Sequence, residues 1–191
     1  MTFLTKAALY RRMDDFRREC GVSGALEPLS LAEQLGIKVS VYSFDSARLS
    51  GALLRGERHC EIILSAARSA EGRRFTLAHE LVHWYLHAGT SFWCSDAKPS
   101  ALEWQANAGA AELLMPYREV LSAVKNIRSL YVSDRVAAAR ALAGGFGVSA
   151  AAAGSRLSEL EGEISQYLSG VPLSEVRVAS RAVQQAGNID L

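Results

Sequence analysis

The chain has 191 residues, of which 49% are hydrophobic and 21% are charged, and its formal net charge is +1. This length and composition suit a globular protein with a substantial core and exclude a disordered chain, while the near-zero net charge argues against a protein that binds nucleic acid mainly by electrostatics. No stretch approaches the roughly 18 consecutive apolar residues of a membrane span, and the charged N-terminal stretch lacks the apolar core of a signal peptide, so we expect a cytoplasmic protein without membrane association.

The N-terminal part of the chain predicts two helices followed by a small sheet. Residues 5–20 repeat apolar side chains at spacings of three and four, which is typical of an amphipathic helix. A capping box at Ser30–Glu33 predicts a short second helix that ends at Gly36. Three further stretches predict strands of one sheet, and they cover residues 38–44, 49–54 and 59–64.

The last of these strands, at residues 59–64, directly precedes the stretch with the clearest chemistry. If this strand lies at an edge of the sheet, its unpaired backbone groups can bind an extended peptide substrate. An internal strand without a binding role fits the sequence equally well, so both alternatives stay open.

Residues 75–87 read FTLAHELVHWYLH and contain the pattern HExxH. On a helix, side chains four residues apart lie on one face, so His79 and His83 can present two imidazole nitrogens to one metal ion. Zn²⁺ accepts such donors, and a catalytic zinc site also needs a third protein ligand and an open position for water. Glu80, next to the first histidine, is the candidate general base of this site.

Apolar residues surround this helix on nearly all sides, so we expect it to be buried. Ser69 and Thr76 are both candidates for its N-terminal cap. Two histidines and a glutamate inside a buried helix are costly unless they are paired or ligated, which favours a metal site. His87 continues the four-residue spacing, but three turns of one straight helix do not wrap a tetrahedral ion, so we expect His87 at the helix end.

A loop is predicted over residues 88–100, and a second helix follows it until Pro116 stops it. Glu103 and Asn107 share one face of this helix. Glu103 is the candidate third metal ligand, and Asn107 is placed to hydrogen-bond a ligating histidine from behind. In the alternative interpretation, Ser100 and Glu103 form a capping box in which Glu103 folds back onto the helix start. The residue types alone do not decide between the two.

The C-terminal third predicts a helix-turn-helix over residues 136–157, with Gly144–Gly145 in the turn and Ser133 and Ser149 as caps. A DNA-reading helix carries Arg, Lys, Asn or Gln on its leading turns, whereas these turns are here Ala150–Ala153. We therefore expect a packing or partner-docking element and no direct DNA binding. Two short helices are predicted to follow, at residues 159–168 and 174–186.

Both predicted site helices carry a family resemblance. The run RFTLAHELVH at residues 74–83, followed by ExxxNxxAAELLMP at residues 103–116, resembles the ImmA/IrrE family of bacterial and phage HExxH metallopeptidases. The similarity covers roughly residues 28–160. One departure from the family pattern is Gln105, where many members carry a second glutamate.

The resemblance implies an α+β, zincin-like fold. We expect the small N-terminal three-stranded sheet to pack on the HExxH helix and on the second, ligand-bearing helix, with a helix-turn-helix-like helical part after them. We accordingly predict a metallopeptidase core at residues 1–127 and a helical C-terminal region at residues 128–191.

The resemblance also implies the activity, a zinc-dependent endopeptidase with His79, His83 and Glu103 as metal ligands and Glu80 as catalytic base. Zn²⁺ is the expected cofactor, although other divalent metals such as Mn²⁺ suit the same donors. Family members typically cleave a helix-turn-helix repressor, so the expected substrate and partner is such a repressor, whose loss switches on a stress, phage or mobile-element programme. The alternative is a non-catalytic regulatory or toxin–antitoxin partner protein that retains the peptidase fold, and the Gln105 departure gives it some weight.

Overall fold

The computed structural model describes residues 4–44, 49–56, 59–87, 91–95 and 101–179. The chain divides into two compact units, which we call the sheet unit (Arg12–Leu114) and the helical unit (Met1–Arg11 with Met115–Leu191). The first helix, α1 (Lys6–Glu19), contributes residues to both units. These units are defined by contacts within the structure and do not test whether the chain has two domains. The domain boundary predicted after residue 127 therefore stays a prediction.

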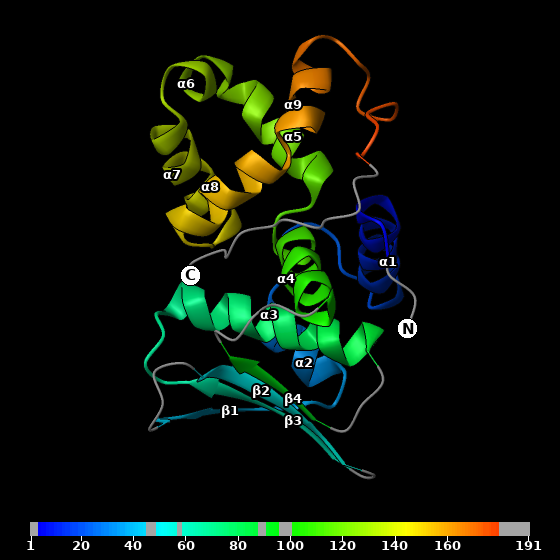
Figure 1. Cartoon of the computed structure of the whole chain (residues 1–191), viewed down its shortest axis with the longest axis vertical. Helices are drawn as coiled ribbons and strands as arrows, with labels where there is room; N and C mark the ends of the chain where they lie inside the picture. The colour runs from blue at the N-terminus through cyan, green and yellow to red at the C-terminus, as the bar shows by residue number, and fades with distance from the viewer. Residues whose placement is uncertain (1–3, 45–48, 57–58, 88–90, 96–100, 180–191) are drawn as a thin grey trace. The chain divides into compact units, whose positions relative to one another are not determined.

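The sheet unit combines a small sheet with helices, which confirms the predicted α+β fold class. After α1, its elements are α2 (Pro28–Gln34), β1 (Lys38–Tyr42), β2 (Leu49–Arg55), β3 (Cys60–Ser65), α3 (Ala70–Leu86), β4 (Ser91–Ser95) and α4 (Ala101–Leu114). Figure 1 shows α3 lying along one face of the sheet, with α4 packed across α3. Leu53 of β2 and Ile62 of β3 are fully buried in the resulting core.

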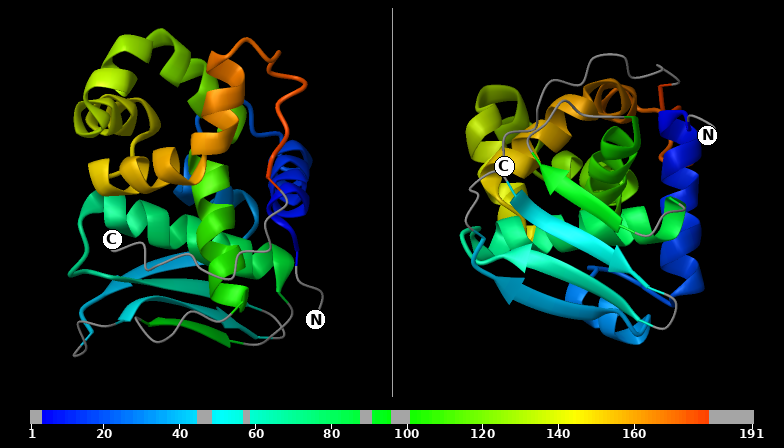
Figure 2. Two further views of the ribbon diagram at one scale, coloured as in Figure 1. Left: turned by 45° about the horizontal axis from the view of Figure 1, so that its top comes forward. Right: turned by 60° about the horizontal axis from the view of Figure 1, so that its bottom comes forward.

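The sheet has the strand order β1-β3-β2-β4, and all three predicted strands are present in it (Figure 2). β3 pairs with β1 in parallel and with β2 in antiparallel orientation. The edge position considered for β3 was therefore wrong, because both sides of its backbone are occupied by neighbouring strands. Among the described strands, β1 and β4 form the two edges.

The loop predicted over residues 88–100 was wrong in its middle part, because Ser91–Ser95 form the fourth strand. β4 runs antiparallel to β2, with Trp93 opposite Ala52. Aromatic residues favour strands, but the turn-forming residues on either side of this short run dominated the sequence pattern. Residues 88–90 and 96–100 lie outside the described part of the chain.

Three predictions about helix ends in this unit were tested by the structure. Ser69 caps α3, and its hydroxyl accepts a hydrogen bond from the Gly72 amide at 3.1 Å. α2 begins at Pro28, a residue that suits the first helical turn, so Ser30 lies inside the helix and the capping box predicted there was wrong. Gly36 follows α2 with a φ of 69°, as expected of a glycine that ends a helix.

In its described residues, the helical unit contains five further helices: α5 (Tyr117–Asn126), α6 (Arg128–Ser133), α7 (Arg135–Phe146), α8 (Ala150–Glu159) and α9 (Glu161–Leu168). Asp134 rather than Ser133 caps α7, accepting from the Ala137 amide at 2.9 Å, because Ser133 is already the last residue of α6. Ser149 caps α8 as predicted.

The predicted turn at Gly144–Gly145 was wrong, because α7 continues through both glycines to Phe146. The helix ends instead at Gly147, whose φ of 63° lies in the left-handed region that favours glycine. The helix predicted at residues 174–186 is also wrong for residues 174–179, which form a turn and irregular chain. Residues 180–186 lie outside the described part.

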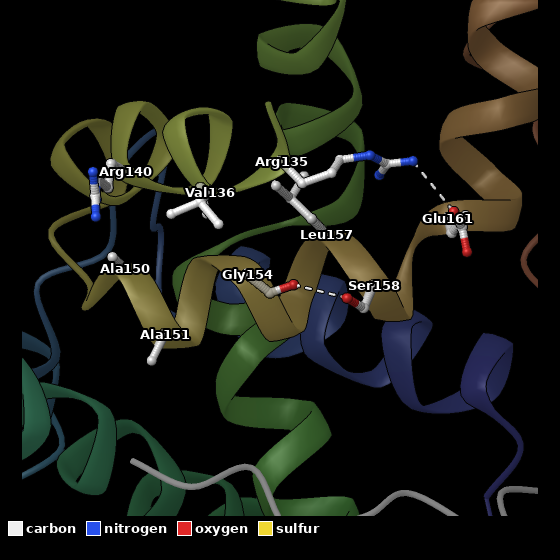
Figure 3. A pocket seen from close by; sticks show the side chains of 10 residues that line it. Arg135, Val136, Arg140, Ala150, Ala151, Gly154, Leu157, Ser158 and Glu161 are labelled. Atoms are coloured by element: carbon white, nitrogen blue, oxygen red, sulfur yellow. Dashed lines mark hydrogen bonds and ion pairs between the residues drawn. The ribbon is translucent and has the colours of Figure 1, made fainter. Parts of the chain in front are cut away.

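A pocket of about 660 Å³ lies between α7 and α8 (Figure 3). The small, exposed side chains of Ala150 and Ala151 line it, together with Val136 and Leu157, and Arg140 stands at its rim. The leading turn of α8 therefore offers small apolar groups at this pocket, although the expectation that the element does not read DNA stays a prediction.

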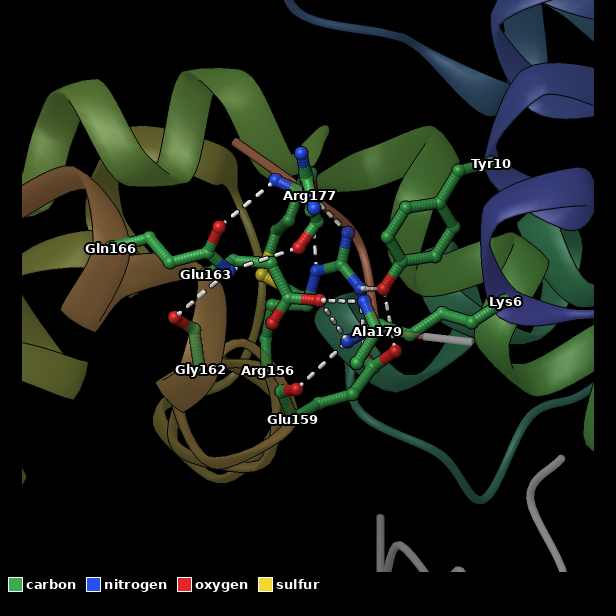
Figure 4. A network of polar contacts seen from close by, with 10 residues as sticks. Lys6, Tyr10, Arg156, Glu159, Gly162, Glu163, Gln166, Arg177 and Ala179 are labelled. Atoms are coloured by element: carbon green, nitrogen blue, oxygen red, sulfur yellow. Dashed lines mark hydrogen bonds and ion pairs between the residues drawn. The ribbon is translucent and has the colours of Figure 1, made fainter. Parts of the chain in front are cut away.

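Arg156, near the end of the second helix of the predicted helix-turn-helix, is only 2% exposed and belongs to a buried polar cluster (Figure 4). Its guanidinium donates to the Met115 carbonyl at 3.0 and 3.1 Å, to the Tyr10 hydroxyl at 2.5 Å and to the Glu159 carboxylate at 2.8 Å. Lys6 and Glu163 form a 3.0 Å ion pair in the same region. These contacts fasten the start of α1 to α8 and α9 within the helical unit.

In the described part of the chain, no single helix has the length and apolar character needed to cross a membrane. α7 and α8 meet these two criteria only when they are taken together, and they are bent by 109° at the break between them.

Candidate metal centre

The candidate site is built on α3 and α4, which pack closely because α4 carries small residues on the facing side. A Cβ atom placed on Gly109 of α4 would lie 2.8 Å from Cγ1 of Val82 in α3 and 3.2 Å from Sδ of Met13 in α1. Ala106 and Ala110, one turn or less away, are completely buried. This close approach lets a carboxylate at the start of α4 reach the histidines of α3.

The site residues of α3 are buried as the sequence predicted. His79 is 4% exposed, and Glu80 and His83 are completely inaccessible. On the sheet side, β2 passes α3 at Gly51, where a Cβ atom would lie 2.6 Å from Thr76 and 3.5 Å from Oε1 of Glu80. Glycine at this point leaves space beside the Glu80 carboxylate.

His79, His83 and Glu103 come together in one triangle of donor atoms. Nε2 of His79 lies 3.0 Å from Nε2 of His83 and 3.2 Å from Oε2 of Glu103, and Nε2 of His83 lies 3.3 Å from Oε1 of Glu103. Glu103 thus faces the histidines and is not folded back onto its own helix. Ser100, the other half of the alternative capping box, lies outside the described residues.

The electrostatics of the triangle favour a cation between its members. Burial opposes the charged form of His79, but the carboxylates of Glu103 and Glu80 outweigh it, so the pKa of His79 is raised above its usual value. The pKa of His83 is lowered, mainly by burial and also by the charge on His79. Burial tends to raise the pKa of Glu103, but its hydrogen bonds to both histidines prevail and lower it strongly.

The donor set and spacing fit a tetrahedral divalent ion. Zinc bonds of about 2.0–2.2 Å at tetrahedral angles place neighbouring ligand atoms about 3.3–3.5 Å apart. The two nitrogens lie 3.0 Å apart, slightly closer than that, while Oε2 of Glu103 lies 3.2 Å from His79 and Oε1 lies 3.3 Å from His83. Two imidazole nitrogens at 3.0 Å also cannot both direct lone pairs at each other without a positive charge between them, and either a proton or a metal ion supplies it. His79, His83 and Glu103 are therefore suited to hold a metal with small rearrangement.

Asn107 lies behind His79, as the shared face of Glu103 and Asn107 suggested. Its side-chain carbonyl accepts a hydrogen bond from Nδ1 of His79 at 2.8 Å. In the neutral imidazole this contact places the hydrogen on Nδ1 and leaves Nε2, the nitrogen that faces Glu103, with the lone pair that a metal ion would take.

Two further residues of the site were not identified from the sequence. His87 ends α3 as expected, but it is buried, and its Nδ1 lies 2.9 Å from Nδ1 of His83. Gln105, predicted only as a departure from a family pattern, is buried with Oε1 3.3 Å from Nε2 of His87. The four-residue spacing of His79, His83 and His87 could have predicted the contact between His83 and His87, because it places them on one face of the helix.

A comparison with known families gives one result. The model of the Peptidase_M78 family, described as the IrrE N-terminal-like domain, matches residues 32–158. This range contains every residue of the donor triangle together with Glu80, His87, Gln105 and Asn107. A search of curated proteins found no match.

Proposed function

The chain belongs to the Peptidase_M78 family, whose model is described as the IrrE N-terminal-like domain, and on this premise we propose that it is a zinc-dependent endopeptidase. The family supports a metallopeptidase-type function for this chain. Our proposal adds three points: the metal is zinc, the enzyme cleaves within a polypeptide rather than at its end, and the individual residues have the roles given below.

The observation that carries the proposal is the cluster of His79, His83 and Glu103, in which each imidazole Nε2 lies 3.2–3.3 Å from one of the two oxygens of the Glu103 carboxylate and the two nitrogens lie 3.0 Å apart. Three protein ligands leave a fourth tetrahedral position open, as a catalytic rather than a structural zinc site requires. A divalent ion bound there supplies Lewis-acid activation of water and of the scissile carbonyl.

Glu80 acts as the general base in this proposal. It follows the ligand His79 on α3, and β2 leaves space beside its carboxylate at Gly51. Glu80 accepts a proton as the water oxygen adds to the carbonyl carbon, and it delivers that proton to the leaving nitrogen as the C–N bond breaks. Asn107 keeps the ring of His79 in the orientation and tautomer that ligation needs.

We propose that the substrate binds in extended form along β4. Gly51 of β2, which adjoins Glu80, lies opposite Cys94 of β4 in the sheet register. Among the described strands, β4 pairs only with β2, so its outer backbone groups are free of strand partners in that part of the chain. Addition of a peptide strand to such an edge gives backbone hydrogen bonds that do not depend on side-chain identity.

The proposed substrate is a helix-turn-helix transcriptional repressor, whose cleavage switches on a stress, phage or mobile-element programme. This choice is supported by the family resemblance alone. It is tested by incubating the purified chain and one equivalent of Zn²⁺ with candidate repressors encoded near it, and by analysing the fragments by mass spectrometry.

The decisive control is a pair of variants. Glu80→Gln is expected to bind Zn²⁺ with near wild-type affinity and to cut the repressor at least about 100-fold more slowly, whereas Glu103→Ala is expected to lose both metal binding and cleavage. If both variants keep the full biological activity of the protein in the cell, the alternative of a non-catalytic regulatory or toxin–antitoxin partner replaces the peptidase proposal.

A further inference from the structure

We infer that two side-chain amides of α4 set the tautomers of both ligating histidines, Asn107 directly on His79 and Gln105 through His87 on His83. This inference rests on the proposed metal site and assigns His87 and Gln105 as positioning residues.

The chain of contacts has a fixed direction. A ligating Nε2 on His83 needs its lone pair, so the hydrogen of the neutral ring must sit on Nδ1. Nδ1 of His83 lies 2.9 Å from Nδ1 of His87, and two imidazole nitrogens at this distance share a single hydrogen. His83 is then the donor and His87 the acceptor, which leaves the hydrogen of neutral His87 on Nε2.

Gln105 completes the sequence of hydrogen bonds. Oε1 of its amide lies 3.3 Å from Nε2 of His87 and accepts that hydrogen. A carbonyl oxygen has no hydrogen to give, so it selects the His87 tautomer whose Nδ1 accepts from His83. Both residues are buried, Gln105 to 4% and His87 to 6% exposure, so water competes little for these bonds.

This arrangement changes the meaning of Gln105. Gln105 is not one of the residues whose donor atoms cluster as possible metal ligands. In the described part of the chain, the carboxylate of that cluster comes from Glu103. Acting through His87, a neutral amide at position 105 fulfils for His83 the orienting task that carboxylates often perform directly behind a metal-bound histidine, and it does so without adding a second negative charge to the buried site.

The test compares variants of the full chain in two measurements. Gln105→Leu removes the acceptor, and we expect Zn²⁺ affinity, measured by competition with a chelator, to fall by about 10- to 100-fold. Gln105→Glu keeps an acceptor oxygen and is expected to stay within about threefold of wild type, because the hydrogen-bond direction is preserved. Thr76→Val is the matched control, since it also removes a buried polar group, the α3 hydroxyl that donates to the Gly72 carbonyl at 3.0 Å, but lies outside the chain of contacts.

The second measurement needs no bound metal. Long-range ¹H–¹⁵N spectra of the metal-free protein report which ring nitrogen of each histidine carries a hydrogen. With a proton in place of the metal between Nε2 of His79 and Nε2 of His83, we expect His83 in the Nδ1–H form in wild type and Gln105→Glu, with that form lost or mixed in Gln105→Leu. If Gln105→Leu keeps both the tautomer and the Zn²⁺ affinity of wild type, the inference is overturned. If the tautomer of His83 differs between the variants as expected but the wild-type protein binds no Zn²⁺, the proposed function is overturned and the inferred order of hydrogen bonds stands.

Discussion

The close packing of α4 on α3 at Gly109 leads to a prediction that links helix packing to metal affinity. Gly109→Ala places a Cβ atom 2.8 and 3.1 Å from the two γ carbons of Val82. Val82 is β-branched and strongly prefers one rotamer in a helix, so the helices must separate instead. Such overpacking costs about 1–3 kcal/mol, while alanine gains about 1 kcal/mol over glycine in helix propensity.

The net expectation is a loss of about 0–2 kcal/mol in the free energy of unfolding, together with weaker Zn²⁺ binding, because displacement of α4 moves Glu103 away from His79 and His83. Gly72→Ala is the matched control, since a Cβ atom there meets its neighbours at 3.4 Å and has no close clash. It should gain up to about 1 kcal/mol and leave Zn²⁺ affinity unchanged.

Urea unfolding followed by circular dichroism, and chelator competition for Zn²⁺, measure the two effects. Val82→Ala combined with Gly109→Ala should restore part of the metal affinity, because the smaller side chain removes the obstacle. The reasoning would be refuted if Gly109→Ala stabilised the protein as much as Gly72→Ala and bound Zn²⁺ equally well.

Three other predictions follow from the same structure. Glu80→Gln should lower the turnover of a cleavable repressor by about 10²- to 10⁴-fold in a gel assay, and activity within threefold of wild type would exclude Glu80 as the base. Arg156→Met should lower the free energy of unfolding by roughly 3 kcal/mol, because it removes the buried donor of the Met115 carbonyl and leaves the Glu159 carboxylate with the Tyr10 hydroxyl but without the guanidinium charge; a loss below about 1 kcal/mol in urea titrations would contradict this. Burial raises the pKa of Glu159, but Arg156 and Lys6 prevail and lower it, so its contribution to stability is complete above its unfolded pKa of about 4.3 and is lost as the pH falls through the lower folded value. Glu159→Gln should therefore lose less stability than wild type between about pH 4.5 and pH 2, as thermal melts in that range can check.

The local sequence pattern predicted the elements that carry the proposed chemistry. The spacing of His79 and His83 defines one face of a helix wherever that helix lies, and the surrounding apolar residues require it to be buried. The spacing of Glu103 and Asn107 likewise placed both on the side of α4 that faces α3. Such periodic features depend on the few residues of one element, so they can be read without knowledge of the rest of the chain.

Predictions that depended on competition between neighbouring signals were less successful. Gly144 and Gly145 suggested a turn, yet α7 passes through them and ends at Gly147, because only there does the backbone adopt a left-handed conformation. Ser133 was predicted as the cap, but it is the last residue of α6, so the adjacent Asp134 occupies the N-cap position of α7. In each case the correct residue lay within three positions of the predicted one.

By itself, the sequence determined that this chain has a buried HExxH helix and a second helix with a carboxylate and an amide on one face, because both follow from short-range periodicity and burial. The α+β, zincin-like fold was implied by the family resemblance of these two helices. Only the tertiary structure decided that β3 is internal, that Ser91–Ser95 form an edge strand against β2, and that His87 and Gln105 meet behind His83. These three facts depend on which segments distant in the sequence become neighbours, and strand pairing and side-chain contacts between elements are set by the packing of the whole unit.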